Sequence, residues 1–325
     1  MKLLRRIVFL LVAAVLGALA LPAAAQDPAW PVKPVKIVVP FPPGGAIDAM
    51  IRALAPSLSQ SLGQAVVIEN KPGAGGVLGT EAALRANDGH TLLMTAMGHT
   101  IYPELYADLK FDPIADFKPI APVGVVPNVV VVPENSPFNT LEDLITYARR
   151  HPGELTYGSA GHGTSLHLTA ALFMQQAGID VQHIPYKGSA PAVTDLVAGR
   201  IDMMFDSSTS AGPFIAAKKL KALAVAATDP SPLLPGVKTI AQSGVPEYRM
   251  TWWYGLLAPK STDDAAVDRV SKAVSAALNS PEVIERFAAL GVEPLKMTRQ
   301  AFGAMVAHDR QAWKERIPAL GIKPN

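Results

Sequence analysis

The chain has 325 residues, of which 49% are apolar, so it can bury the core of one large domain or two ordinary ones, and intrinsic disorder is excluded. Its formal charge of +2 arises from Lys2, Arg5 and Arg6, because the residues after position 25 carry 26 basic and 27 acidic side chains. Such a balance, with dispersed basic residues and 6% aromatics, excludes a nucleic-acid partner. The chain contains no Cys, which excludes disulfides, thiolate nucleophiles and Cys-ligated metals.

The N-terminal residues have the order of a secretory signal peptide. The three basic residues precede an apolar run over 7–21, and Pro22 and three alanines follow it. This run is shorter than the roughly 20 residues that a membrane-spanning helix needs. We therefore predict cleavage after Ala25, with residues 1–25 as the signal peptide and the mature chain in the periplasm; an uncleaved membrane anchor is the alternative.

Short β-rich runs alternate with helical patterns, which predicts an α/β fold with mostly parallel sheets flanked by helices. In the first third of the chain the expected strands are 36–39, 66–69 and 91–95, and the expected helices are 47–62 and 79–86.

The remainder continues the alternation with clear helix ends. Thr140 and Asp143 form a predicted capping box, and Thr164, Ser189, Ser280 and Thr298 begin further helices. The expected strands are 129–132, 183–186, 201–205 and 222–226, and the apolar stripe of 267, 270, 274 and 278 predicts another helix.

Four glycine-bearing loops each follow a strand and precede a helix: 40–48, 70–79, 96–101 and 159–164. Helix N-termini at the carboxyl ends of strands offer free N–H groups to anions, and glycine lets a ligand reach the backbone. A carboxylate fits such a site as well as a phosphate does. The alternative is that the glycines only satisfy tight turns.

Other kinds of site are poorly supported. The glycines of 73–79 have the wrong spacing for a dinucleotide fingerprint, and no Ser lies in Gly-x-Ser-x-Gly. No histidine pair has zinc-helix spacing, so His162 and His167 are interpreted as loop and packing residues. Asp48 is interpreted as a first-turn acid rather than a general base. We expect no catalytic set, no cofactor and no metal.

Ordered motifs along nearly the whole mature chain resemble the Bug family, the periplasmic solute receptors of tripartite tricarboxylate transporters. The motifs lie at 40–48 with Arg52, 69–76, 88–91, 111–113, 116–117, 157–164 with 167–168, 185–188, 223–225 and 253–255.

The resemblance implies a type II periplasmic-binding fold with a ligand between two lobes. The first lobe would combine 26–126 with 250–325, the second would hold 127–249, and two hinge segments would lie near 125–132 and 250–257. The implied ligand-binding residues are Phe41, Gly44, Gly45, Ala46, Asp48, Gly75, Gly76, Val77, His99, Ser159, Gly161, His162, Gly163, Thr164 and Asp206.

The chain departs from the family at Ile47, which could make the pocket more apolar, and at Tyr102, where an Asn is usual; His90, Lys238 and Gln242 also differ. The leading hypothesis is a monomeric exported receptor for a small organic carboxylate: a mono-, di- or tricarboxylate, an aromatic acid or an acidic amino acid. It would deliver the ligand to a membrane permease or present it to a sensor. The alternatives are a periplasmic hydrolase or lyase using Ser159 or His162, and a structural protein with an empty cleft.

Overall fold

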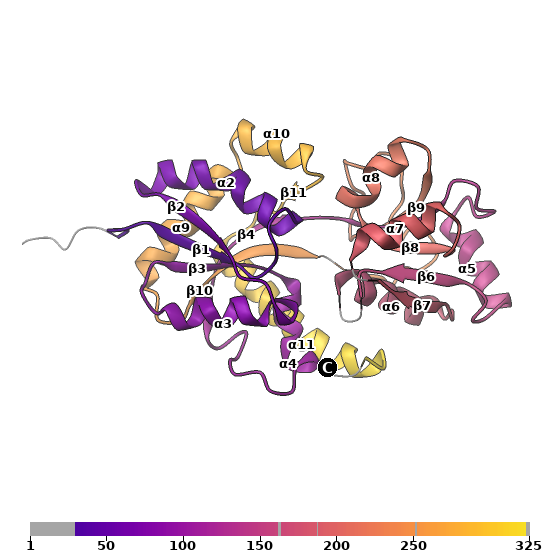
Figure 1. The fold of residues 1–325 in the computed structure, drawn as a ribbon, viewed down its shortest axis with the longest axis horizontal. Helices are drawn as coiled ribbons and strands as arrows, with labels where there is room; N and C mark the ends of the chain where they lie inside the picture. Colours follow the sequence, from indigo (N-terminus) through magenta and orange to yellow (C-terminus); the bar gives the residue numbers. More distant parts are fainter. Residues whose placement is uncertain (1–29, 162–163, 187, 251, 323–325) are drawn as a thin grey trace, which may run out of the picture.

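Two β-sheets organise the described residues, which are 30–161, 164–186, 188–250 and 252–322 of the computed structural model (Figure 1). The first sheet contains, in spatial order, β11 (Glu293–Pro294), β4 (Phe117–Val125), β10 (Trp253–Pro259), β3 (Thr91–Ala96), β1 (Val35–Val39) and β2 (Val66–Asn70). The second contains β7 (Gln182–Pro185), β6 (Thr156–Ser159), β8 (Met203–Ser207), β5 (Asn128–Pro133) and β9 (Leu220–Ala226).

Both sheets are mixed, which corrects the expectation of mostly parallel sheets. In the first sheet β1 is parallel to β2 and β3, whereas β10 is antiparallel to β3 and β4, and β11 is antiparallel to β4. In the second, β6 is parallel to β7 and β8, but β5 is antiparallel to β8 and β9. The physical reason in the first sheet is that the chain leaves this sheet along β4 and returns to it along β10. These two strands are neighbours, so they run in opposite directions. The α/β class itself is confirmed.

Alternation along each strand directs side chains to two helical layers. In β1, Val35, Ile37 and Val39 face the buried cluster of α2 (Ala46–Leu62), α9 (Asp264–Ala277) and α10 (Pro281–Ala289), while Val38 faces α3 (Val77–Ala86) and α11 (Arg299–Ala319). The second sheet packs in the same way between α5 (Leu141–Arg150) with α6 (Ser165–Ala177) on one face and α7 (Ser189–Val197) with α8 (Ser208–Ala216) on the other.

Helix starts agree with the sequence signals. Thr140 and Asp143 form the predicted capping box of α5, and Thr164, Ser280 and Thr298 cap α6, α10 and α11 through their side-chain oxygens. Several elements were not predicted, among them β4, β6, β10 and α8. Prolines lie within β4 and α8, and proline is a poor indicator of either a strand or a helix interior.

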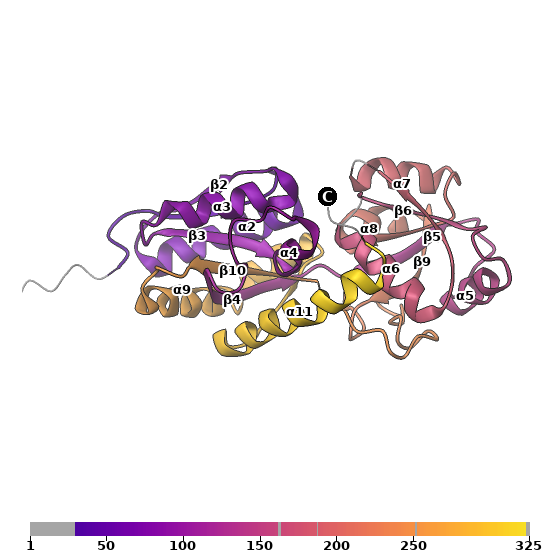
Figure 2. The same cartoon turned by 90° about the horizontal axis from the view of Figure 1, so that it is seen from below.

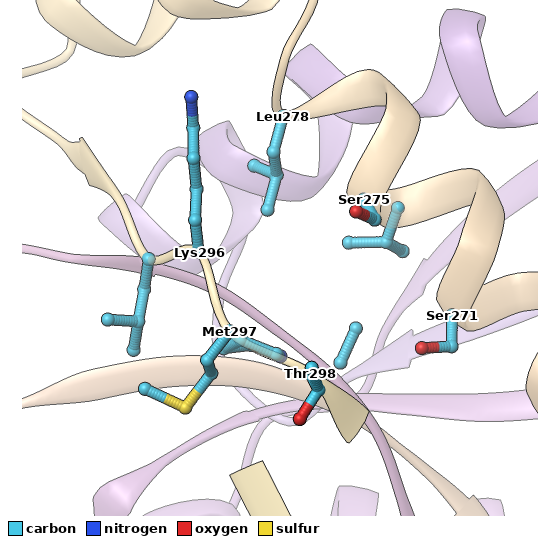
Figure 3. A pocket seen from close by; sticks show the side chains of 10 residues that line it. Ser271, Ser275, Leu278, Lys296, Met297 and Thr298 are labelled. Carbon is cyan, nitrogen blue, oxygen red and sulfur yellow. The ribbon is translucent and has the colours of Figure 1, made fainter. Parts of the chain in front are cut away.

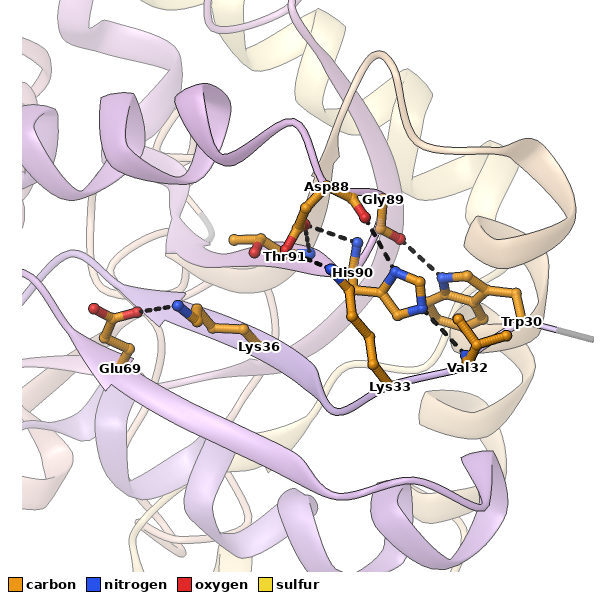
Figure 4. A network of polar contacts seen from close by, with 9 residues as sticks. All are labelled: Trp30, Val32, Lys33, Lys36, Glu69, Asp88, Gly89, His90 and Thr91. Carbon is orange, nitrogen blue, oxygen red and sulfur yellow. Dashed lines mark hydrogen bonds and ion pairs between the residues drawn. The ribbon is translucent and has the colours of Figure 1, made fainter. Parts of the chain in front are cut away.

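The start of the described chain is fastened to the turn before β3 (Figure 4). The indole N–H of Trp30 donates to the carbonyl of Gly89 at 2.8 Å, and the backbone N–H of Val32 donates to Nε2 of His90 at 3.3 Å. Because Nε2 accepts, the proton of His90 resides on Nδ1, which donates to the carbonyl of Asp88 at 3.1 Å. His90, a departure from the family pattern, therefore has a packing role: it joins the segment that contains Val32 to the turn before β3.

The long C-terminal helix α11 contacts both halves of the molecule (Figure 2). At its start Phe302 packs edge-on against Trp253 at 5.1 Å, and at its end the side-chain amide of Gln175, in α6, donates to the carbonyl of Ala319 at 3.3 Å. A further contact between the halves is the hydrogen bond that the hydroxyl of Ser231 donates to the carboxylate of Glu293 at 2.5 Å. The halves are thus joined by more than the two chain crossings.

Candidate functional site

The first predicted loop ends at an open helix N-terminus. Gly45 is the N-cap of α2 and no side chain caps the helix there, so the N–H groups of Ala46 and Ile47 have no hydrogen-bond partner among the described residues. These donors follow the carboxyl end of β1, where the helix dipole adds positive potential. The Ile47 side chain, however, is 5% exposed and packs in the core, so the expectation that it makes the pocket more apolar is not supported.

The buried carboxylate of Asp48 holds this loop through hydrogen bonds. Its side chain is 4% exposed, and Oδ2 accepts from the N–H of Gly44 and from Nε of Arg52, both at 2.9 Å. Oδ1 accepts from the side-chain amide of Asn70 at 2.9 Å, and that amide also donates to the carbonyl of Phe41 at 3.1 Å. Asp48 is a first-turn acid, as predicted. Its contacts make it a residue that ties the first loop to the end of β2.

The charge of Asp48 stabilises the native state. Burial alone would raise the pKa of Asp48, but hydrogen bonds from Arg52, Gly44 and Asn70 hold that pKa below its ordinary value of 3.8. We expect Asp48→Asn to lower the free energy of unfolding by about 2 kcal/mol at pH 7, because a donor NH2 then meets other donors. Since the folded pKa is depressed, the wild-type advantage is complete above about pH 5 and is lost as the pH falls through the folded pKa.

Urea unfolding of the two proteins at pH 7 and at about pH 3 tests this linkage. The difference between them should shrink at the lower pH. An equal difference at both pH values would mean that the ionised carboxylate is not the source of the stabilisation.

The second predicted loop satisfies three of its own N–H groups. The N–H groups of Gly76 and Leu78 both point to the carbonyl of Gly73, at 2.9 and 3.5 Å, and the N–H of Val77 donates to the carbonyl of Ala74. Gly76 and Val77, expected to offer N–H groups to a ligand, therefore use them inside the loop. Among the described residues of this loop, Ala74 and Gly75 keep N–H groups without a partner.

The third predicted loop is part of the core. It forms the 3-10 helix η2 (Met97–Ile101), and His99 is fully buried among Tyr102, Phe111 and Phe117. Its Nε2 lies 2.8 Å from the carbonyl of Pro113. Burial lowers the pKa of His99 to about 4, although the Pro113 hydrogen bond opposes this, so the ring is neutral at pH 7. The expectation that His99 contacts a ligand is contradicted by this burial.

The fourth predicted loop leads to a second helix N-terminus with free N–H groups. The hydroxyl of Thr164 caps α6 by accepting from the N–H of His167 and donates to the carbonyl of Gly161 at 2.8 Å. This leaves the N–H groups of Ser165 and Leu166 without a partner among the described residues. The predicted ligand residues His162 and Gly163 lie outside the described residues. The loop follows the carboxyl end of β6, in the second sheet.

Ser159 holds this loop in shape. Its Oγ lies 2.7 Å from Nε2 of His183 and accepts from the N–H of Gly161 at 3.1 Å. The His183 ring stacks between Tyr157, at 4.7 Å, and His167, at 4.3 Å. Although a Ser–His contact can serve nucleophilic catalysis, Ser159 is fully buried and cannot present Oγ to a substrate carbonyl in this arrangement.

Asp206 is a buried acid at the end of β8. Its Oδ1 accepts from the hydroxyl of Ser189 and from the N–H of Ser207, while Oδ2 is buried without a partner among the described residues. Burial raises the pKa of Asp206, although the serine hydrogen bonds lower it in part. Because Asp206 is 0% exposed, it acts on its surroundings through Ser189 and Ser207. Those serines begin α7 and cap α8 respectively.

A pocket of about 240 Å³ lies elsewhere, on the flank of the first sheet (Figure 3). It lies between α9 and the segment before α11, and its lining is Ala121, Pro122, Ser271, Val274, Ser275, Leu278, Leu295, Lys296, Met297 and Thr298. No residue of the four predicted loops lines it. Among the described residues no cluster of three His, Asp or Glu side chains is placed to hold a metal ion, and no helix is long and apolar enough to cross a membrane.

Known proteins resemble this chain over most of its length. The family model described as "Tripartite tricarboxylate transporter family receptor" matches residues 50–322. The chain belongs to this receptor family. The receptor also resembles the solved periplasmic binding protein BugD, with a TM-score of 0.77 and 34% identity over 91% of this chain and 100% of the other.

Two further solved structures similar to this receptor carry ligands. A protein of R. palustris solved with adipate has a TM-score of 0.80 and 32% identity, covering 91% of the receptor and 100% of that chain. MatC of Rhodopseudomonas palustris, solved with malate, has a TM-score of 0.75 and 30% identity over 88% and 99% of the two chains. The two-lobed α/β fold expected from the sequence is shared with such solute-binding proteins.

Proposed function

We propose that this receptor binds a small organic carboxylate between its two lobes and delivers it to the membrane permease of a tripartite tricarboxylate transporter. The observation that supports this most strongly is the pair of helix N-termini with free N–H groups, of α2 after β1 and of α6 after β6. Each follows the carboxyl end of a strand, and the two strands belong to different sheets. Backbone donors on both sides can then surround a carboxylate without a cationic side chain. The adipate and malate carried by similar proteins belong to this ligand class.

The proposed contacts come from Phe41, Gly44, Gly45 and Ala46 on one side and from the 159–164 loop on the other, with Gly75 beside the first loop. Asp48 positions the first of these loops through its hydrogen bonds, and Asp206 holds the starts of α7 and α8 through Ser189 and Ser207. His99 is left out because its ring is buried. The receptor would act as a monomer, without catalysis.

We propose that the lobes have the expected boundaries, 26–126 with 250–325 and 127–249, and that they move about the segments near 125–132 and 250–257. Export to the periplasm would follow cleavage after Ala25. The contacts of α11 and Glu293 with the second lobe would limit how far the lobes separate.

Mass spectrometry of small molecules released from freshly purified protein is the direct test. We expect a carboxylic acid. Ligand-stripped protein should then be screened by thermal shift with mono-, di- and tricarboxylates, aromatic acids and acidic amino acids. We expect the acid that binds to raise the melting temperature, since a hundredfold excess over Kd adds about 2.7 kcal/mol to stability.

The same screen separates a receptor from its alternatives. If a neutral sugar shifts the melting temperature and no carboxylate does, the proposed ligand class is wrong. The Ser159–His183 contact is the feature that a hydrolase would need, so each probe that binds should also be recovered after long incubation. Conversion of a probe by the wild-type protein, and not by Ser159→Ala, would replace the receptor function with an enzymatic one.

A further inference from the structure

Tyr102 lies directly beneath the second glycine loop. Its hydroxyl donates to the carbonyl of Gly75 at 3.3 Å. A Cβ atom built on Gly76 would lie 2.4 Å from this hydroxyl oxygen. The phenol therefore lies so close to the backbone that a side chain at position 76 would clash with it. Gly76 also has a φ of +109°, which favours glycine.

The position of that hydroxyl is fixed by aromatic packing. The Tyr102 side chain is 3% exposed, and its ring packs edge-on against His99, Tyr106 and Phe111, with ring centres 5.6 to 6.2 Å apart. The third predicted loop therefore affects the second one through Tyr102, although the third loop is itself buried.

Thr80 secures the other carbonyl of the loop. Its hydroxyl donates to the carbonyl of Gly76 at 3.0 Å, in a fully buried environment. With the carbonyls of Gly75 and Gly76 both held by hydroxyls, the turn keeps the form in which the Gly73 carbonyl receives the N–H groups of Gly76 and Leu78.

We propose that Tyr102, aided by Thr80, is the positioning residue that holds the second glycine loop in its self-satisfied form, so that this loop shapes the ligand site instead of supplying its anion-binding donors. The proposal deepens the carboxylate receptor function and rests on it. It assigns charge recognition to the N-termini of α2 and α6, and it makes the second loop a rigid wall of the ligand site.

Tyr102→Phe removes the hydroxyl and keeps the packed ring. We expect hydrogen exchange of the peptide that contains residues 73–78 to accelerate about tenfold in the ligand-free protein, because the Gly75 carbonyl loses its partner. Affinity for adipate, used as the probe and measured by calorimetry, should fall about tenfold, since a looser loop must be ordered on binding. Tyr248→Phe is the matched control, because Tyr248 is also fully buried but contacts Met250 instead.

A double-substitution cycle tests the contact itself. Gly76→Ala creates a methyl group against the Tyr102 hydroxyl, so its effect on adipate affinity should be several-fold smaller in the Tyr102→Phe background than in the wild type. The strain of a positive φ is the same in both backgrounds and cancels from the comparison. Additive effects of the two substitutions would overturn the proposed contact.

The outcomes separate this proposal from the function on which it rests. If the wild type binds adipate and Tyr102→Phe changes neither exchange at 73–78 nor affinity, the positioning role is wrong and the receptor function stands. If Tyr102→Phe accelerates exchange but the wild type binds neither adipate nor any acid of the carboxylate panel, the carboxylate function fails, and with it the role of this loop in a carboxylate site. Loss of affinity with unchanged exchange would likewise overturn the positioning role.

Discussion

Replacing Gly45 with Val is expected to lower the affinity for a carboxylate probe about 100-fold. Gly45 is the N-cap of α2, and its branched replacement would stand in front of the free N–H groups of Ala46 and Ile47. Hydrogen bonds to a charged acceptor contribute about 1.5 to 3 kcal/mol each, and 1.4 kcal/mol is a tenfold change, so obstruction of this pair gives a loss of that size.

The fold should tolerate this substitution. Gly45 has φ −77° and ψ 168°, which any residue adopts, and an added Cβ would meet only the Pro42 carbonyl oxygen, at 3.9 Å. Calorimetry with adipate and the far-UV circular dichroism spectrum provide the measurements. Gly98→Val is the matched control, because an added Cβ at Gly98 also meets open space and Gly98 lies in η2, away from the N-terminus of α2. Unchanged affinity in Gly45→Val would remove the α2 N-terminus from the site.

Gly79→Ala is expected to lower the free energy of unfolding by about 3 kcal/mol, at the upper end for overpacking. A Cβ at this position would lie 2.5 Å from the carbonyl oxygen of Lys71 and 2.6 Å from Cα of Pro40, both backbone atoms that cannot rotate away. Helix α3 must then move off the ends of β1 and β2, from which the first two loops begin. Carboxylate affinity should fall with the stability.

Gly303→Ala is the control for Gly79→Ala. Gly303 lies inside α11, where an added Cβ would make only an ordinary contact with Cγ of Pro119 at 3.6 Å, so alanine there should raise stability slightly, by about 0.4 to 1 kcal/mol. Urea unfolding compares the two variants with the wild type. A loss for Gly79→Ala that is no greater than 0.5 kcal/mol would show that α3 is not held close to the loop ends.

Local sequence signals predicted many of the elements. The caps at Thr140, Thr164, Ser280 and Thr298 depend on residues three positions apart, so a reader of the sequence sees both partners. Strand β4 was missed because three of its nine residues are Pro or Gly, and its place is fixed by pairing with β10, more than a hundred residues later. The mixed character of both sheets has the same origin.

The four loops illustrate the limit more sharply. All four have the glycines and the position between strand and helix that favour anion binding, and by this pattern they are equivalent. The structure distinguishes them: the carbonyl of Gly73 accepts from two N–H groups of the second loop, and the carbonyl of Pro113 and three aromatic rings enclose His99 in the third. Within the glycine pattern of 73–79, the structure gives Gly79 a steric role in packing, against the backbone of Lys71 and Pro40.

The basic excess of the chain lies in its first 25 residues. The sequence by itself determined the near-neutral chain after residue 25, the α/β alternation, the helix caps and the family resemblance, because each depends on composition or on residues close in sequence. Only the tertiary structure decided which backbone N–H groups are free. That depends on the conformation of each loop, which is held by hydrogen bonds between residues far apart in the sequence, such as those that Tyr102 donates to Gly75 and Asn70 donates to Asp48.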